Sequence, residues 1–130
     1  MSSKPQRTPF SLVLHDGQYE RVHYGLVMAS AAAAIGRAVT VLFAGSAVEV
    51  LQNSYVPPEQ DMQFQARKVA GLEELLIACH ELGARLIVCE TALAIADTSA
   101  ADLRTDLALK TGGFVTYLNA IGEGGHSLFV

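Results

Sequence analysis

The chain has 130 residues, of which 51% are hydrophobic and 17% are charged, and its formal net charge is −4 at pH 7. This length predicts one domain with a substantial core, and the acidic balance gives no electrostatic reason to expect nucleic acid or an anionic membrane as a partner. Because the charge content is low for a monomer of this size, we expect a homo-oligomer in which other subunits cover part of the apolar surface.

The cysteines indicate a reducing compartment, and the apolar runs predict no membrane span. Cys79 and Cys89 fit neither a CxxC motif nor the spacing of a zinc site, so we expect no disulfide framework and no metal. The chain does not begin like a signal peptide, and the longest apolar run, 25–35, is too short to cross a bilayer. The glycines at 122–125 precede a predicted strand and so do not form a phosphate loop. We therefore expect a cytoplasmic protein without a membrane partner or a cofactor.

The N-terminal part predicts a strand and a long helix. Residues 1–8 are polar and indicate a flexible tail, which leaves 9–130 as a single α/β domain. A strand over 11–14 leads into a turn, where Asp16 can cap a helix over 18–35. The second half of that helix consists mostly of small residues, which allow close packing against a sheet or another helix.

The middle of the chain predicts a second strand, two helices and a long connection between those helices. The strand covers 39–43, and a short helix follows over 47–51. The segment 52–69 contains two prolines and gives no clear prediction, and connections of this length often act as lids, binding loops or contact surfaces. Apolar residues recur at helical spacing over 72–82, which predicts an amphipathic helix with Cys79 on its apolar stripe.

A short buried strand then runs directly into a helix, with a cysteine at the joint. Residues 86–88 are continuously apolar, as in a strand covered on both faces, and 90–96 is rich in helix formers. Cys89 therefore falls at the carboxyl end of the strand and the amino end of the helix. Unpaired backbone N–H groups at such a place favour a thiolate.

The last part of the chain continues the alternation of strands and helices. It predicts a capped turn over 99–102, a weak strand over 107–109, a helix over 114–121 and a final strand over 127–130. This alternation indicates right-handed crossovers and parallel strands. We therefore predict a three-layer α/β/α sandwich around a five-stranded, mostly parallel sheet.

The candidate site residues gather at one edge of the predicted sheet. In a parallel α/β sheet, ligands bind outside the carboxyl ends of the strands. Cys89 is the candidate nucleophile at this edge. Weaker candidates for holding a small anionic ligand are His15, Ser46, Glu90, Thr111 and Gly112.

A structural interpretation stands beside each functional one. Cys89 is either a nucleophile or a small buried hydrophobic residue that ends a strand, and the carboxylate of Glu90 beside it opposes a thiolate. His15 is either an anion ligand or a solvated turn residue. Cys79, on the leucine stripe of its helix, fits a structural role.

Five segments carry a family resemblance, and together they span nearly the whole chain: 11–36, 39–48, 72–83, 86–96 and 113–118. They resemble the DsrE/DsrF-like family of small α/β proteins, some of which relay sulfur as cysteine persulfide. The resemblance implies homo-oligomers, commonly trimers or hexamers, and sulfur-donor and sulfur-acceptor proteins as partners. It also implies that Cys89 carries the sulfur. One departure is Asp97, where family members often have glycine.

Three hypotheses follow. The first is a cytoplasmic sulfur carrier that uses Cys89. The second is a noncatalytic oligomeric module that binds a small anionic ligand at the carboxyl edge of the sheet. The third is an oligomer with no site of its own, in which the segment 52–69 serves assembly or covers Cys89.

Overall fold

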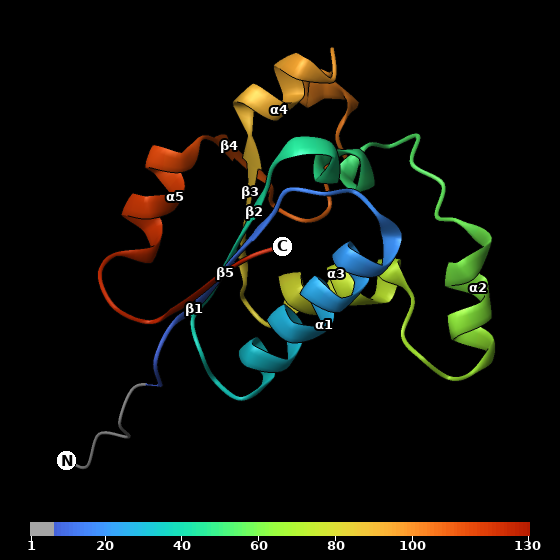
Figure 1. Ribbon diagram of the computed structural model, residues 1–130, viewed down its shortest axis with the longest axis horizontal. Helices are drawn as coiled ribbons and strands as arrows, with labels where there is room; N and C mark the ends of the chain where they lie inside the picture. Colours follow the sequence, from blue (N-terminus) through green and yellow to red (C-terminus); the bar gives the residue numbers. More distant parts are fainter. Residues whose placement is uncertain (1–6) are drawn as a thin grey trace.

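A five-stranded parallel sheet forms the centre of the computed structural model, with its strands in the order β4-β3-β2-β1-β5 (Figure 1). The structure describes residues 7–130, so most of the tail expected over residues 1–8 lies outside it. The strands are β1 (Phe10–Leu14), β2 (Val39–Phe43), β3 (Arg85–Cys89), β4 (Lys110–Gly112) and β5 (His126–Phe129). The α/β fold and the parallel sheet are confirmed.

Within residues 7–130, five α-helices and two 3-10 helices connect these strands. The α-helices are α1 (Tyr19–Ala34), α2 (Glu59–Ala66), α3 (Leu72–Glu81), α4 (Glu90–Ile95) and α5 (Phe114–Ile121). The 3-10 helices are η1 (Gly45–Leu51) and η2 (Ala100–Asp102). The capped turn predicted over 99–102 corresponds to η2, where Ser99 and Asp102 form a capping box.

The strand order explains on which face of the sheet α1, α3 and α5 lie. From β1 to β4 the chain moves one strand at a time in one direction, and it then returns across the sheet to place β5 beside β1. Right-handed crossovers put connections that move in opposite directions on opposite faces. Accordingly α1 and α3 pack together on one face, whereas α5 lies against the other (Figure 1).

Alternation along the strands gives each face its own side chains. Leu14 faces α1, because a Cβ atom on Gly25 of that helix would come 2.5 Å from a Leu14 methyl carbon. Its register partner Phe43 pairs in turn with Val88 on β3, so these side chains share that face. The next residue, Cys89, therefore points to the face that α5 covers.

Three local predictions were wrong. The strand expected over 107–109 is a turn in which Leu107 is buried, and the strand is β4 at 110–112. The segment 52–69 is not a plain connection, since it contains α2. The expected cap at Asp16 is instead Gln18, whose side-chain oxygen accepts from the Arg21 N–H at 3.1 Å.

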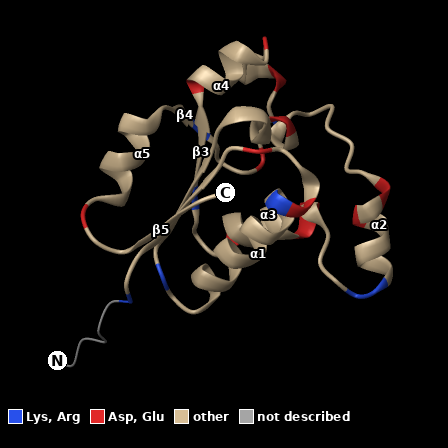
Figure 2. Cartoon of the chain, in the orientation of Figure 1, with Lys and Arg blue, Asp and Glu red and all other residues tan. Residues whose placement is uncertain are grey.

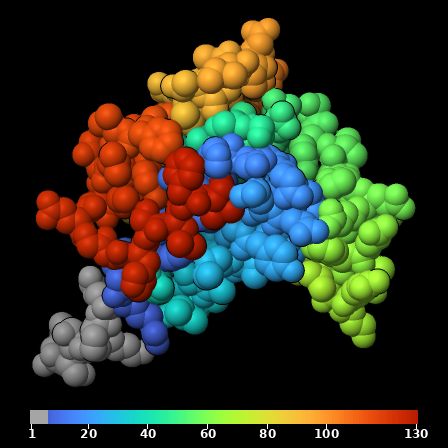
Figure 3. All heavy atoms as spheres, viewed as in Figure 1, coloured from blue at the N-terminus to red at the C-terminus, as the bar shows by residue number. Residues whose placement is uncertain are grey.

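A buried carboxylate holds α2 against the rest of the molecule. Asp61, only 5% exposed, accepts hydrogen bonds from the Tyr19 hydroxyl, from the backbone N–H of Leu72 at 2.8 Å and from the Gln65 side chain at 2.8 Å. Asp61 thus caps α3 from outside that helix and ties α2 to α1. Figure 3 shows the α2 segment projecting beside α1.

Candidate functional site

Cys89 occupies the joint between β3 and α4, as the sequence predicts. It is the last residue of β3 and the N-cap residue of α4, with φ −70° and ψ 120°. No side chain among the described residues caps α4, so its first backbone N–H groups keep hydrogen-bonding capacity beside the cysteine. The residue is 4% exposed.

The Cys89 side chain lines a partly open cavity of about 550 Å³. The walls come from three elements that are distant in sequence: η1, α4 and the start of α5. The lining residues are Ala44, Gly45, Ser46, Glu49, Cys89, Thr91, Ala92, Ile95, Ala96, Gly113 and Phe114. The walls are mostly apolar, and Glu49 is the charged residue among them. We call this space the Cys89 cavity.

Gly112 lets α5 approach the sheet beside the cavity. It is the register partner of Cys89 on the neighbouring strand β4. A Cβ atom at Gly112 would lie 2.7 Å from Oγ1 and 2.8 Å from Cβ of Thr116 on α5. A larger residue would therefore displace the helix whose first residue, Phe114, forms one wall of the cavity.

A close crossing of two loops positions Ser46. The Ser46 Oγ atom accepts a hydrogen bond from the Gly17 N–H at 2.7 Å. Gly45 adopts φ +50°, and a Cβ atom there would lie 2.1 Å from the carbonyl oxygen of His15. A glycine is required at this position because both the backbone conformation and the contact exclude a side chain.

The structure brings together only part of the predicted set. Ser46 and Cys89 line the same cavity, and Gly112 is adjacent to it in the sheet. Glu90 and Thr111 are exposed and do not line the cavity. His15 lies two strands away, where its Nδ1 atom is 3.0 Å from the Val130 carbonyl oxygen and its ring contacts the Phe129 ring in a tilted arrangement.

Glu49, Ile95 and Phe114 are lining residues that the sequence analysis did not single out. Each follows a predicted strand by only a few positions, which is the one signal that could have found them. Ile95 is 81% exposed and Phe114 is 44% exposed. Both therefore present apolar surface at the opening of the cavity.

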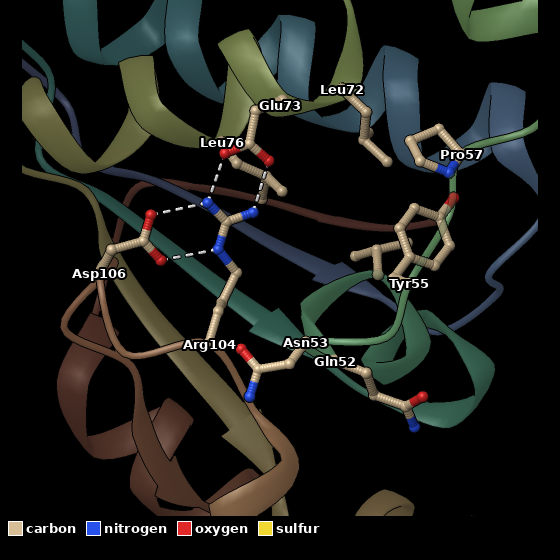
Figure 4. A pocket seen from close by; sticks show the side chains of 10 residues that line it. Gln52, Asn53, Tyr55, Pro57, Leu72, Glu73, Leu76, Arg104 and Asp106 are labelled. Atoms are coloured by element: carbon tan, nitrogen blue, oxygen red, sulfur yellow. Dashed lines mark hydrogen bonds and ion pairs between the residues drawn. The ribbon is translucent and has the colours of Figure 1, made fainter.

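A second cavity, of about 340 Å³, contains the densest group of charges but does not form an anion site (Figure 4). Arg104 forms two hydrogen bonds with Glu73, at 2.5 and 2.7 Å, and two with Asp106, at 2.7 and 2.8 Å. These hydrogen bonds raise the pKa of the Arg104 guanidinium and lower the pKa of Asp106 to about 2. Two carboxylates thus neutralise the arginine, which joins α3 to the segment before β4.

Cys79 differs from Cys89 in its surroundings. It is fully buried, and its Sγ atom is 3.8 Å from the Leu26 carbonyl oxygen on α1. Burial raises the pKa of the Cys79 thiol to about 11. A neutral thiol enclosed between two helices acts as a packing group.

Across residues 7–130, no group of three or more His, Cys, Asp or Glu side chains has an arrangement that could hold a metal ion. Within the same residues, no helix combines the length and apolar character needed to cross a bilayer.

Comparison with protein families matches the DsrE/DsrF-like family over residues 11–129, nearly the whole chain. The chain belongs to the DsrE/DsrF-like family. This membership confirms the resemblance seen in the sequence and supports a role related to sulfur relay.

Solved structures similar to this DsrE/DsrF-like chain support the fold. One is a protein of unknown function, MTH1491, from Methanobacterium thermoautotrophicum, with a TM-score of 0.64 at 13% identity; the match covers 95% of this chain and 100% of that one. Another is a conserved protein of unknown function, BT1422, from Bacteroides thetaiotaomicron, with a TM-score of 0.63 at 14% identity, covering 95% of each chain. The comparison with curated proteins finds no match.

Proposed function

We propose that the protein is a cytoplasmic sulfur carrier that accepts sulfane sulfur on Cys89 as a persulfide and passes it to an acceptor. The observation that carries the proposal is the position of Cys89 on the wall of a partly open cavity of about 550 Å³. The other cysteine, Cys79, is fully buried between α1 and α3. Family membership supports a role in sulfur relay.

The proposed chemistry is two thiol exchange steps without net oxidation. The Cys89 thiolate attacks the outer sulfur of a donor persulfide, a new sulfur–sulfur bond forms, and the donor leaves as a thiolate that takes up a proton. An acceptor thiolate then attacks the outer sulfur of the Cys89 persulfide and releases the Cys89 thiolate. Cys89 is the N-cap residue of α4, so the positive end of that helix dipole lies beside the anionic sulfur in both steps.

We also propose that the carrier works as a homo-oligomer, a trimer or hexamer, with donor and acceptor proteins as transient partners. The apolar residues exposed on α5, including Val115 at 74% and Leu118 at 58%, support this proposal. Figure 2 shows that α5 carries no charged residue. Exposed apolar surface of this kind favours association with another protein.

The experiment is mass spectrometry of the intact protein and its peptides after exposure to a persulfide donor. The expected result is a gain of about 32 Da on the Cys89 peptide, with no gain on the Cys79 peptide. Cys89→Ser should abolish the gain, and Cys79→Ser is the matched control that should keep it. An unmodified Cys89 in the folded wild-type protein would refute the proposal.

A second candidate is a noncatalytic module that binds a small ligand in the same cavity. The 4% exposure of Cys89 favours it, because a nearly buried thiol can also serve as part of an apolar wall. The alkylation rate of Cys89 in the folded protein separates the two. A rate close to that of an unhindered thiol supports the carrier, and a rate as low as that of Cys79 supports the binding module.

A further inference from the structure

The Cys89 cavity has an unusual combination of features for a site that would receive a charged sulfur donor. Its walls are mostly apolar, its opening carries Ile95 and Phe114, and its one charged lining residue is the carboxylate Glu49. No lysine or arginine lines it in the part of the chain that the structure describes.

The segment that supplies the α4 wall of the cavity is acidic, although its acidic residues do not line the cavity. The segment 86–103, which contains α4 and η2, has Glu90, Asp97 and Asp102 but no basic residue. Figure 2 shows acidic but no basic colour on α4 and the loop that follows it. The nearest cation along the sheet, Lys110, pairs in register with Ile87, two residues before Cys89 on β3.

We infer that the Cys89 cavity selects its sulfur donor by charge: it prefers a persulfide borne on an uncharged or cationic, largely apolar group and reacts more slowly with anionic donors of the thiosulfate type. Glu49 is the specificity-determining residue. This inference rests on the proposed function, because it names the substrate class of the same cysteine.

The physical reason is repulsion during the approach. The attacking sulfur of Cys89 is itself anionic, so an anionic donor brings a second negative charge toward it and toward Glu49. The cavity offers no lysine or arginine to offset these charges, and its apolar walls gain free energy by contact with an apolar donor group. Glu49 is exposed, however, so solvent screening limits its effect to about a threefold to tenfold difference in rate between donors of opposite charge.

The test compares two thiol-reactive reagents of similar size and opposite charge. They are the cationic trimethylammonium-ethyl methanethiosulfonate and the anionic sulfonato-ethyl methanethiosulfonate. Each transfers its alkylthio group to a thiolate and releases methanesulfinate. The rate of modification is read on the Cys89 peptide of the full-length folded protein and divided by the rate of the same reagent with free mercaptoethanol. The expected ratio of cationic to anionic rates is about ten, and Glu49→Gln should lower it about threefold.

Glu59→Gln is the matched control, because Glu59 is an exposed carboxylate on α2 that does not line the Cys89 cavity. It should leave the ratio unchanged. Equal normalised rates for the two reagents, or an equal effect of Glu59→Gln, would overturn the charge selectivity and leave the carrier proposal standing. If Cys89 reacts with neither reagent in the folded protein, the carrier proposal fails and the selectivity fails with it.

Discussion

Asp61 is expected to be among the residues most important for stability, although it is far from the Cys89 cavity. Its carboxylate is 5% exposed and accepts from Tyr19, Leu72 and Gln65. Through these contacts it joins α2 to α1 and caps α3. Replacement by alanine removes the acceptor and leaves its donors inside the protein.

The size of the effect follows from those donors. Asp61→Ala leaves the Leu72 N–H and the Tyr19 hydroxyl without an acceptor, and both residues are buried, at 1% and 7% exposure. Each unsatisfied buried donor costs about 1–3 kcal/mol, so the free energy of unfolding should fall by about 3–4 kcal/mol. This is a large fraction of the total stability of about 5–15 kcal/mol for a domain.

Urea unfolding measures this change. With a slope of about 2 kcal/mol per M, the midpoint should fall by about 1.5–2 M. Asp61→Asn can keep Oδ1, which accepts from both Tyr19 and Leu72, and loses only the acceptor of Gln65, so it should lose much less stability than Asp61→Ala. The double variant Tyr19→Phe with Asp61→Ala should lose less than the sum of the single variants, since no buried hydroxyl is then left unpaired. A midpoint shift below about 0.5 M for Asp61→Ala, or strict additivity in the double variant, would show that this account is wrong.

Three further predictions concern titration and packing. Because burial raises the pKa of the Cys79 thiol to about 11, the free energy of unfolding should fall as the pH rises from about 9 to about 11. In Cys79→Ser, urea unfolding at several pH values should show a weaker dependence of this free energy on pH. Because hydrogen bonds from Arg104 lower the pKa of Asp106 to about 2, a small stabilisation should be lost as the pH falls from about 4 to about 2, and Asp106→Asn should remove this dependence. Gly112→Ala should lower stability by about 1–3 kcal/mol, because its Cβ atom meets Thr116, and Thr116→Ala should restore part of the loss in thermal unfolding.

The buried strands could be predicted because their own residues specify them. Residues 86–88 are apolar, as are 39–43 apart from Thr40, and they lie within β3 and β2, which are covered on both faces. The strand β4 could not be predicted, since Lys110-Thr111-Gly112 has no strand pattern and forms an edge of the sheet only by pairing with β3. The apolar residues before it misled the prediction. Leu107 enters the core from a turn, and Ala108 adopts φ +51°.

The helix α2 was missed for a different reason. It is polar, and the sequence shows no apolar stripe over 59–66. What stabilises it is a long-range contact, the hydrogen bonds of Asp61 with Tyr19 and Leu72. A carboxylate that caps a helix eleven residues later in the chain gives no local pattern.

The position of the Cys89 cavity follows from the strand order. In open parallel sheets a crevice forms where the connections after two adjacent strands leave toward opposite faces. Here β3 and β4 are adjacent, and the chain continues in one direction after β3 but returns across the sheet through α5 after β4. The connections after β3 and β4 therefore separate between Cys89, at the end of β3, and Gly113, just after β4. Both residues line the cavity. The strand order thus places the crevice at Cys89, whereas Cys79, on α3, lies against α1 away from that point.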